Sequence, residues 1–509
     1  MEEKDMRQDW QNSPEGPEEQ ALPAFATGKK ELIFGALILI FGMLLCNSVL
    51  YGGFYLGFAI FSSLTVLSSA VYLRLSGHKL TFYSGSLLLL SLVICCGFGR
   101  SDDGFVKFVM VCFLLIAVNL GLCLQAGQNL RSSAGIKSLL DAPRTLLVLG
   151  IGRQPHAWRG VIRACRSSSG AAKKGGSVLL GLVIAVPLLA ILIPLLVSAD
   201  AAFDALLQKL PDWDFGELFV TVFFGTVLVC VLYCRGVALH GNRSEGKEKA
   251  SGKKGMSPVT VNTVLSAVVV LYAVYLVSQL SYFFGGFMGL LPEEYTMAEY
   301  ARRGFFEMAW ICAINLSVIA LSVGLVKKEA KAPLSTRLLC LFIGLVTLLL
   351  VATASAKMSL YINAYGLTRL RVLTEVIMIW LGITTAVVSV WLFVPKLPYM
   401  KAVLLCALLM GAIVFWADVD TVTARYNVDA YLSGKMETVD VDYLSTLGDG
   451  AVPQLQRLRL EADADIAEQA ARAIEQQYIN SSEDFREWNY VNYQAEKSIV
   501  RVGEDTEET

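Results

Sequence analysis

Tyr365-Gly-Leu-Thr-Arg-Leu-Arg-Val-Leu-Thr-Glu375 is a short polar stretch that leads directly into a long apolar run. A similar stretch, Tyr300-Ala-Arg-Arg-Gly-Phe-Phe-Glu307, leads into an earlier apolar run. In each stretch an arginine stands four residues before a glutamate, and residues four apart share a face of a helix. The two stretches therefore predict two membrane helices that each begin with a pair of opposite charges, Arg303 with Glu307 and Arg371 with Glu375.

The composition is that of a membrane protein. Of the 509 residues, 55% are hydrophobic and only 17% are charged, which is too apolar for a soluble globular chain of this length. The apolar residues fall into runs of about 17 to 25, each long enough to cross a hydrocarbon core of roughly 30 Å. We therefore expect an all-α fold, a polytopic transmembrane helical bundle.

About eleven apolar runs are candidate membrane spans. The first two are closely spaced and the third is short, so the count depends on these three. The predicted spans are 31–50, 53–73, 81–98, 104–124, 177–197, 217–235, 261–283, 305–326, 337–356, 372–394 and 400–417. They divide the chain into a polar tail (1–30), spans one to four (31–124), a basic loop (125–176), spans five to eleven (177–417) and an acidic C-terminal segment (418–509).

Lysine and arginine are concentrated in every second connection between these spans. Membrane insertion places such basic connections on the cytoplasmic side. We therefore predict a plasma-membrane protein with a cytoplasmic N-terminus. An odd number of spans then places residues 418–509 outside the cytoplasm.

The loop 125–176 is basic, and residues 136–166 within it combine leucines and valines with arginines. A basic amphipathic segment of this kind lies along anionic lipid headgroups. We therefore expect the lipid bilayer, with anionic lipid at the cytoplasmic loops, to be a partner of this chain.

The acidic segment 418–509 carries helix-stop glycines, such as Gly434 and Gly448, between short amphipathic runs. This pattern predicts a small α-helical C-terminal domain outside the membrane. Its core is thin, so we expect the domain to pack on the outer ends of the spans rather than to fold alone. It is also the predicted binding site for a protein partner.

Charged residues close to the starts of spans that enter from the outer side indicate a polar vestibule. Such residues are costly in a membrane unless they face protein or water. The candidate vestibule residues are Lys107, Glu217, Tyr300, Arg303, Glu307, Tyr365, Arg371 and Glu375. A purely structural interpretation also fits, because a glutamate in the first turn complements the helix dipole and arginine–glutamate pairs extend to the membrane interface.

The sequence carries no recognisable catalytic, metal or cofactor motif. The three histidines, His78, His156 and His240, stand in predicted inner connections, and most of the 11 cysteines lie inside apolar runs. A glycine-rich phosphate loop with lysine is absent as well. We therefore predict no catalytic residue, no metal, no cofactor and no nucleic-acid partner, and we do not expect an enzyme.

Two strings together resemble the signature of a group of bacterial polytopic membrane proteins: Ala298-Glu-Tyr-Ala-Arg-Arg-Gly-Phe-Phe-Glu307 and Tyr361-Ile-Asn-Ala-Tyr-Gly-Leu-Thr-Arg-Leu-Arg371. This group is described as domain of unknown function 4173, with domain of unknown function 4153 as a close relative. Ser198-Ala-Asp200 and Asp442-Tyr-Leu444 fit the same pattern, and the resemblance covers the chain from about span five onward. It implies a multipass plasma-membrane protein and supplies no activity, substrate or catalytic residue.

Two classes of function remain open. One is a small-solute transporter or permease that uses the vestibule, and the other is a non-catalytic envelope or signalling component whose outer domain recognises a partner. A transporter should have a cavity that reaches the membrane midplane between spans five, eight and ten. A component of the second class should have a packed bundle with polar groups at its rim, and the apolar midplane portions of the spans favour this class.

Overall fold

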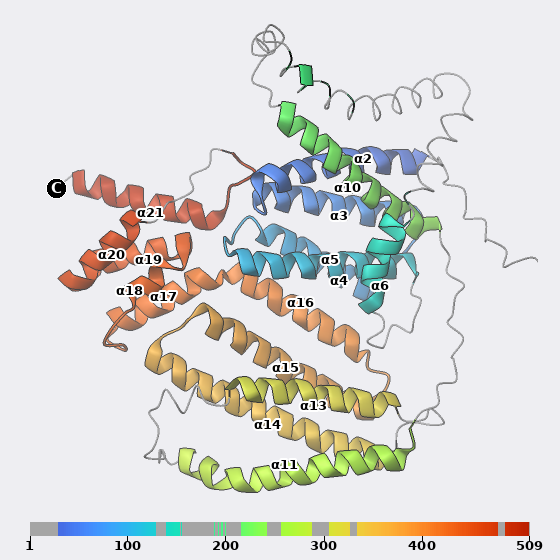
Figure 1. Cartoon of the computed structure of the whole chain (residues 1–509), viewed down its shortest axis with the longest axis vertical. Coiled ribbons are helices and arrows are strands. Elements are labelled where there is room, and N and C mark those ends of the chain that lie inside the picture. Colours follow the sequence, from blue (N-terminus) through green and yellow to red (C-terminus); the bar gives the residue numbers. More distant parts are fainter. Residues whose placement is uncertain are drawn as a thin grey trace, which may run out of the picture.

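The chain forms a bundle of long helices with a group of shorter helices at one end (Figure 1). The structure is a computed structural model that describes residues 29–128, 139–152, 215–241, 256–287, 305–325, 333–476 and 484–507, with a few single residues between 154 and 199. Within these ranges every regular element is a helix, so the all-α prediction is confirmed for the described residues.

The first half of the bundle is built mainly from the N-terminal helices. α2 (Lys29–Asn47) continues through the π-helical turn η1 (Ser48–Gly52) and is followed by α3 (Leu56–Leu75), α4 (Phe82–Gly97) and α5 (Gly104–Ala126). α10 (Phe215–Gly241) packs along α2, while α6 (Asp141–Arg144) packs on α5 and η3 (Thr145–Ile151) on α10. α16 (Tyr399–Ala417) joins from the far end of the sequence by packing on α4 and α5. One apolar core fills this half, with Phe34, Ile94 and Phe415 among its buried side chains.

The second half of the bundle surrounds one long helix. α14 (Leu334–Tyr365) contacts α11 (Pro258–Phe287), α13 (Phe305–Leu325) and α15 (Arg369–Phe393). This half has its own buried apolar clusters, which include Met378 and Leu265. Because α15 also contacts α16, the two halves meet along α16.

The described helices agree closely with the predicted spans. Nine of them are long and apolar enough to cross a membrane, and α4, at 16 residues, is a shorter apolar helix. These ten helices coincide with ten of the predicted spans, and the chain is a multipass membrane protein. The remaining predicted span, 177–197, lies outside the described residues apart from isolated positions, so the total number of spans stays a prediction.

Five short helices follow α16 and cluster at one end of the bundle (Figure 1). They are α17 (Val419–Leu432), α18 (Val441–Ser445), α19 (Val452–Glu461), α20 (Ala464–Gln476) and α21 (Tyr490–Glu507), with the 3₁₀ turn η4 (Gly448–Ala451) before α19. Gly434 and Gly448 follow α17 and α18 with φ values of 72° and 66°, the left-handed conformation typical of helix ends. The cluster has an apolar core of its own around Val428, Leu444 and Leu455.

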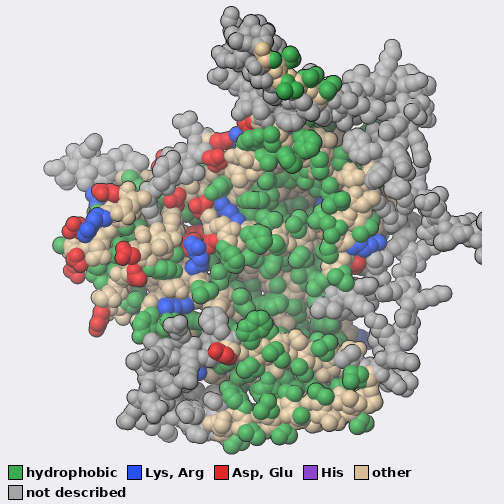
Figure 2. All heavy atoms as spheres, in the orientation of Figure 1, with side chains coloured by type: hydrophobic (Ala, Val, Ile, Leu, Met, Phe, Trp, Pro, Cys, Tyr) green, Lys and Arg blue, Asp and Glu red, His purple; other side chains and the backbone are tan. Residues whose placement is uncertain are grey.

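The surface of the bundle has an apolar belt. Figure 2 shows hydrophobic side chains covering the visible face of the long helices, whereas acidic side chains gather over the short C-terminal helices. Large apolar side chains such as Leu271, Trp310 and Leu345 are exposed on this belt. Apolar surface of this extent indicates contact with lipid.

Part of the predicted amphipathic loop is packed into the bundle. In η3, Leu149 and Gly150 are buried, and Gly150 lies close to Val231 of α10. Leu147 and Val148 point outward and are exposed. The described part of this loop therefore has an apolar outer face, and the predicted contact with anionic lipid stays untested.

Candidate functional site

The turn between α14 and α15 is fixed to the C-terminal helices through its backbone. The Leu367 N–H donates to Asn427 Oδ1 at 2.7 Å, and Asn427 Nδ2 donates back to the Leu367 carbonyl at 2.8 Å. Gly366 has a φ of 74°, a conformation that favours glycine. A Cβ atom at Gly366 would also stand 2.6 Å from Asn427 Oδ1, so the turn requires glycine for both reasons.

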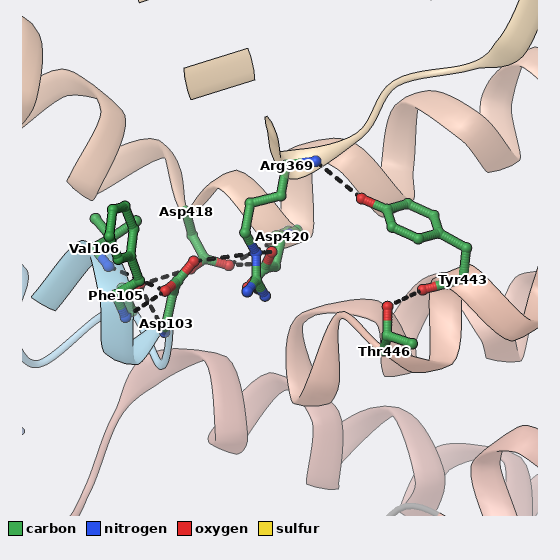
Figure 3. A network of polar contacts seen from close by, with 10 residues as sticks. Asp103, Phe105, Val106, Arg369, Asp418, Asp420, Tyr443 and Thr446 are labelled. Atoms are coloured by element: carbon green, nitrogen blue, oxygen red, sulfur yellow. Dashed lines mark hydrogen bonds and ion pairs between the residues drawn. The ribbon is translucent and has the colours of Figure 1, made fainter. Parts of the chain in front are cut away.

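Arg369, the first residue of α15, is the centre of the site (Figure 3). Its Nε and Nη2 donate to the two carboxylate oxygens of Asp420 in α17, at 2.7 and 2.6 Å. Its backbone N–H donates to Tyr443 Oη at 2.9 Å. A two-pronged contact between guanidinium and carboxylate is directional and strong. Arg369 therefore ties the start of a membrane helix to both α17 and α18.

Asp103 approaches the same guanidinium from α5. It caps that helix, because its Oδ1 accepts from the backbone N–H groups of Phe105 and Val106 at 2.8 and 3.1 Å. Its Oδ2 lies 3.2 Å from Arg369 Nε. Because the Nε hydrogen is already directed at Asp420, this second contact is an ion pair without a hydrogen bond.

Asp418 occupies the corresponding position at the start of α17. One carboxylate oxygen accepts from Ser101 Oγ at 2.9 Å and the other accepts from the Thr421 N–H at 3.2 Å. Asp418 directly follows α16 and has a φ of 56°. Figure 3 shows Asp103, Asp418 and Asp420 grouped around the Arg369 side chain.

These residues line a pocket where the membrane helices meet the C-terminal helices. Its volume is about 150 Å³, and we call it the rim pocket. Its walls come from the starts of α5, α15, α17 and α21 and from the segment that contains η4. The lining residues are Asp102, Asp103, Gly104, Arg369, Asp418, Asp420, Thr446, Leu447, Gly448, Asp449, Gly450 and Val491.

The rim pocket is strongly acidic. Five of its lining residues are aspartates and one is an arginine. Burial raises the pKa of Asp420 to about 6, with Asp103 and Asp418 adding to the rise and Arg369 opposing it. Burial, together with the charge of Asp102, raises the pKa of Asp449 to about 6 as well. Negative charge is therefore held in this pocket at a cost in free energy.

Lys107 lies beside the rim pocket and is buried. Its Nζ is 3.4 Å from Asp102 Oδ1 and stands 3.4 Å from the centroid of the Tyr55 ring. Tyr55 in turn donates its hydroxyl hydrogen to Asp102 Oδ1 at 2.7 Å. The predicted vestibule lysine thus forms a compact group with one carboxylate and one aromatic ring.

A second ionic cluster joins the C-terminal segment to the first half of the bundle. Arg486 Nη1 donates to Asn47 Oδ1 at 2.6 Å and to Glu217 Oε1 at 2.9 Å, and Arg486 Nε donates to Asp484 Oδ2 at 2.6 Å. These contacts raise the pKa of Arg486 and lower that of Asp484. The Gly57 N–H also donates to the Arg486 carbonyl at 3.2 Å. Residues 484–490 therefore run across the ends of α2, α3 and α10.

The structure places the predicted vestibule residues in several locations. Lys107 lies beside the rim pocket and Glu217 belongs to the Arg486 cluster. Tyr365 is the last residue of α14 and is exposed, and Arg371 donates to the carbonyls of Tyr365 and Gly366 and lies over the Tyr361 ring.

Of the two predicted arginine–glutamate pairs, the structure describes both members of one, Arg371 and Glu375. Within the described residues, no ion pair joins Arg371 to Glu375, and one oxygen of the half-buried Glu375 has no hydrogen-bond partner. Glu307 is exposed at the start of α13. Tyr300 and Arg303 lie outside the described residues. The vestibule therefore stays a prediction.

None of the residues that line the rim pocket is among the candidate residues predicted from the sequence. Arg369 stands inside the string 365–375, but the arginine–glutamate spacing selects Arg371, because residue 373, four after Arg369, is a leucine. The available signals were the pair Asp102-Asp103 directly before a span and Asp418-Val-Asp420 directly after one. Acids at the ends of apolar runs can cap helices, and here they also face one arginine.

A family model described as "Domain of unknown function (DUF4153)" matches residues 84–458. The match begins in α4, earlier than the resemblance predicted, and it takes in every rim-pocket residue except Val491. The family matched is the one expected as the relative of the resembled group. No curated protein and no solved structure matches the chain significantly.

Proposed function

The chain belongs to the DUF4153 family of domains of unknown function, and we propose that it is a non-catalytic envelope or signalling component whose C-terminal helices bind a partner outside the cytoplasm. The observation that carries this proposal is the set of contacts that Arg369 makes. These contacts connect the starts of two long apolar helices, α5 and α15, to α17 and α18. A partner bound to the C-terminal helices would therefore act directly on the ends of membrane helices.

The polar groups inside the second half of the bundle support this class over a transporter. Asn315 of α13 is buried, accepts from the Tyr272 hydroxyl at 2.6 Å and donates to Thr347 Oγ1 at 2.9 Å. These three side chains satisfy one another between α11, α13 and α14. The rim pocket, in contrast, lies at the helix ends, where a recognition site is accessible.

The proposed orientation follows the distribution of basic residues. In a plasma membrane, lysine and arginine in alternate connections favour a cytoplasmic N-terminus and an outer C-terminal segment. A phosphatase fused after residue 509 should be active, because it requires export, and a fluorescent protein that folds only in the cytosol should stay dark at the same position. The reverse pair of results would contradict the orientation.

Partner binding can be tested in intact cells by photocrosslinking. A benzophenone side chain is introduced at Leu460 of α19, which is exposed on the C-terminal helices, or at Leu345 of α14, which is exposed on the apolar belt. We expect a discrete protein adduct from position 460 and none of the same mass from position 345. No adduct at 460, or the same adduct at both positions, would contradict the proposal.

A further inference from the structure

We infer that the rim pocket binds an organic cation, an ammonium or guanidinium group that donates hydrogen bonds to its aspartates. This inference deepens the proposed function, and it rests on that function for the location of the cation outside the cytoplasm. The binding itself depends only on the geometry of the pocket.

The first argument is the balance of charge. The pocket is lined by five aspartates, and Arg369 is the cation in its wall. Arg369 pairs with Asp420 and Asp103, and Lys107 pairs with Asp102 from beside the pocket. Two cations against five carboxylates leave an excess of three formal negative charges in a partly buried space. Such an excess favours the binding of a cation.

The second argument is the Asp449 side chain. Asp449 lines the pocket and is 9% exposed. Unlike Asp418, which is held by Ser101 and Thr421, the Asp449 carboxylate has no hydrogen bond or ion pair within the described part of the chain. A buried carboxylate without a partner is costly. A bound N–H donor would supply the missing partner.

The third argument is the chemistry of the space. In the part of the chain that the structure describes, no three carboxylate, imidazole or thiolate groups converge closely enough to hold a metal ion. The carboxylates instead line a volume of about 150 Å³, which is larger than a bare ion needs and smaller than the pockets of about 300 to 1,000 Å³ that hold drug-sized ligands. A planar group with several N–H donors can reach carboxylates on separate walls. Arg369 already binds Asp420 in this manner.

Two sources could supply this cation: a free small amine and a lysine or arginine side chain of a protein partner. Calorimetric titration of the full-length protein in lipid nanodiscs distinguishes them. The probes are ethylguanidinium and putrescine for the free source, the tripeptide Gly-Arg-Gly for the side chain, and tetramethylammonium as a cation without N–H donors. Calcium chloride is the metal probe.

We expect saturable binding of the N–H cations and none of tetramethylammonium or calcium. Asp449→Asn should weaken binding about tenfold, the effect of losing one charged hydrogen-bond partner. Asp442→Asn, at an exposed aspartate of α18 outside the pocket lining, is the matched control and should bind as the natural protein does. Tighter binding of the tripeptide than of ethylguanidinium identifies the side chain as the source, and the opposite order identifies a free amine.

A second variant keeps the test decisive if Asp449→Asn does not fold. Thr446 is exposed and lines the pocket, so Thr446→Lys places an ammonium group within reach of the aspartates and should abolish binding of added cations. The inference is overturned if no N–H cation binds, if tetramethylammonium or calcium binds equally well, or if Thr446→Lys leaves binding unchanged. Crosslinking at Leu460 reports on the partner independently, so the inference and the proposed function can fail separately.

Discussion

Asp103 and Asp418 each have two structural roles. As caps they accept backbone N–H groups at the starts of α5 and α17, a contribution of about 1 kcal/mol for each cap. Their carboxylates also face Arg369 and the rim pocket. Because capping fixes the direction of each carboxylate, the two cannot rotate apart to relieve their repulsion. Helix formation therefore concentrates negative charge in this pocket.

Gly366 should be indispensable for the α14–α15 turn. Gly366→Ala forces a side chain into a left-handed conformation and against Asn427 Oδ1, and we expect the free energy of unfolding to fall by about 2 kcal/mol. Gly324→Ala in α13 is the control, because open space surrounds that position. Thermal unfolding in nanodiscs measures both variants. Equal stability of the two would show that the turn tolerates a side chain.

The buried aspartates predict a stability that rises as the pH falls. Asp449 has a folded pKa of about 6 against an ordinary value of 3.8, so the folded state binds its proton more tightly than the unfolded state. The contribution of Asp449 to the free energy of unfolding should therefore decrease as the pH rises from about 4 to about 6 and then level off. Asp420 acts in the same direction.

Asp449→Asn isolates this effect. At pH 7.5 we expect the variant to be more stable than the natural protein by about 1 to 2 kcal/mol, less than the full shift implies because water screens part of the charge. Near pH 4 the difference should vanish. Thermal unfolding at the two pH values measures it, and a difference that does not depend on pH would argue against a buried, ionised Asp449.

At the scale of elements, the C-terminal segment is attached to the bundle by residues 484–490 as well as by α17. The backbone N–H groups of Leu56 and Gly57 donate to the carbonyls of Trp488 and Arg486, both at 3.2 Å. A Cβ atom at Gly52 would stand 2.5 Å from the Arg486 Cβ. The absence of a side chain at Gly52 therefore allows the Arg486 backbone to pack closely on η1.

Arg486→Ala should loosen this attachment locally. We expect faster hydrogen exchange at the Leu56 and Gly57 amides. Exchange in α14 should be unchanged, because the lost hydrogen bonds to Asn47, Glu217 and Asp484 do not involve that helix. Arg472→Ala, at an exposed pair with Glu468, is the matched control. Exchange that rises throughout the chain would instead indicate that Arg486 supports the whole fold.

α10 contains an arginine that the bundle encloses. Arg235 is 4% exposed, donates to Asn119 Oδ1 at 3.3 Å and to Ser69 Oγ at 3.4 Å, and has no partner at Nε among the described residues. A buried charge with only neutral partners costs free energy. Arg235→Met should therefore raise the free energy of unfolding by about 1 to 3 kcal/mol.

Thermal unfolding in nanodiscs tests the Arg235 prediction, with Arg74→Met at an exposed position of α3 as the control. A stabilised Arg235→Met protein would imply that the guanidinium is retained for function, as intramembrane charges commonly are. A loss of more than about 1 kcal/mol, the scale of a single hydrogen bond, would show that its two hydrogen bonds outweigh its burial.

At the scale of the whole molecule, the membrane helices were predictable because a span must be long and apolar wherever it packs. The exact ends of these helices were less predictable from the sequence. α14 extends to Tyr365, well beyond the predicted end at 356, and α10 extends past Arg235 to Gly241. In α10, Arg235 bonds to Asn119 and Ser69 and the His240 ring contacts His78, and in α14 Ser359 bonds within its own helix; hydropathy alone does not reveal these contacts.

The candidate site was less predictable because its parts are far apart in sequence. The packing of α16 on α4, α5 and α15 joins the two halves of the bundle, and this arrangement brings together Asp103, Arg369 and Asp420. Lys107 and Glu217 were identified because each charge stands close to an apolar run. Their partners, Asp102 and Arg486, could be assigned only from the fold.

The length of α16 and its direct junction with Asp418 should couple the geometry of the rim pocket to the thickness of the bilayer. This helix is 19 residues long, spans about 28 Å at 1.5 Å per residue, and is followed without a spacer by Asp418. A thicker bilayer favours a more upright helix and a thinner one favours greater tilt. Each change would displace the Asp418 carboxylate relative to Arg369. Ethylguanidinium affinity should therefore differ between nanodiscs of short-chain and long-chain lipids, and equal affinity in both would mean that the adjoining helices absorb the tilt.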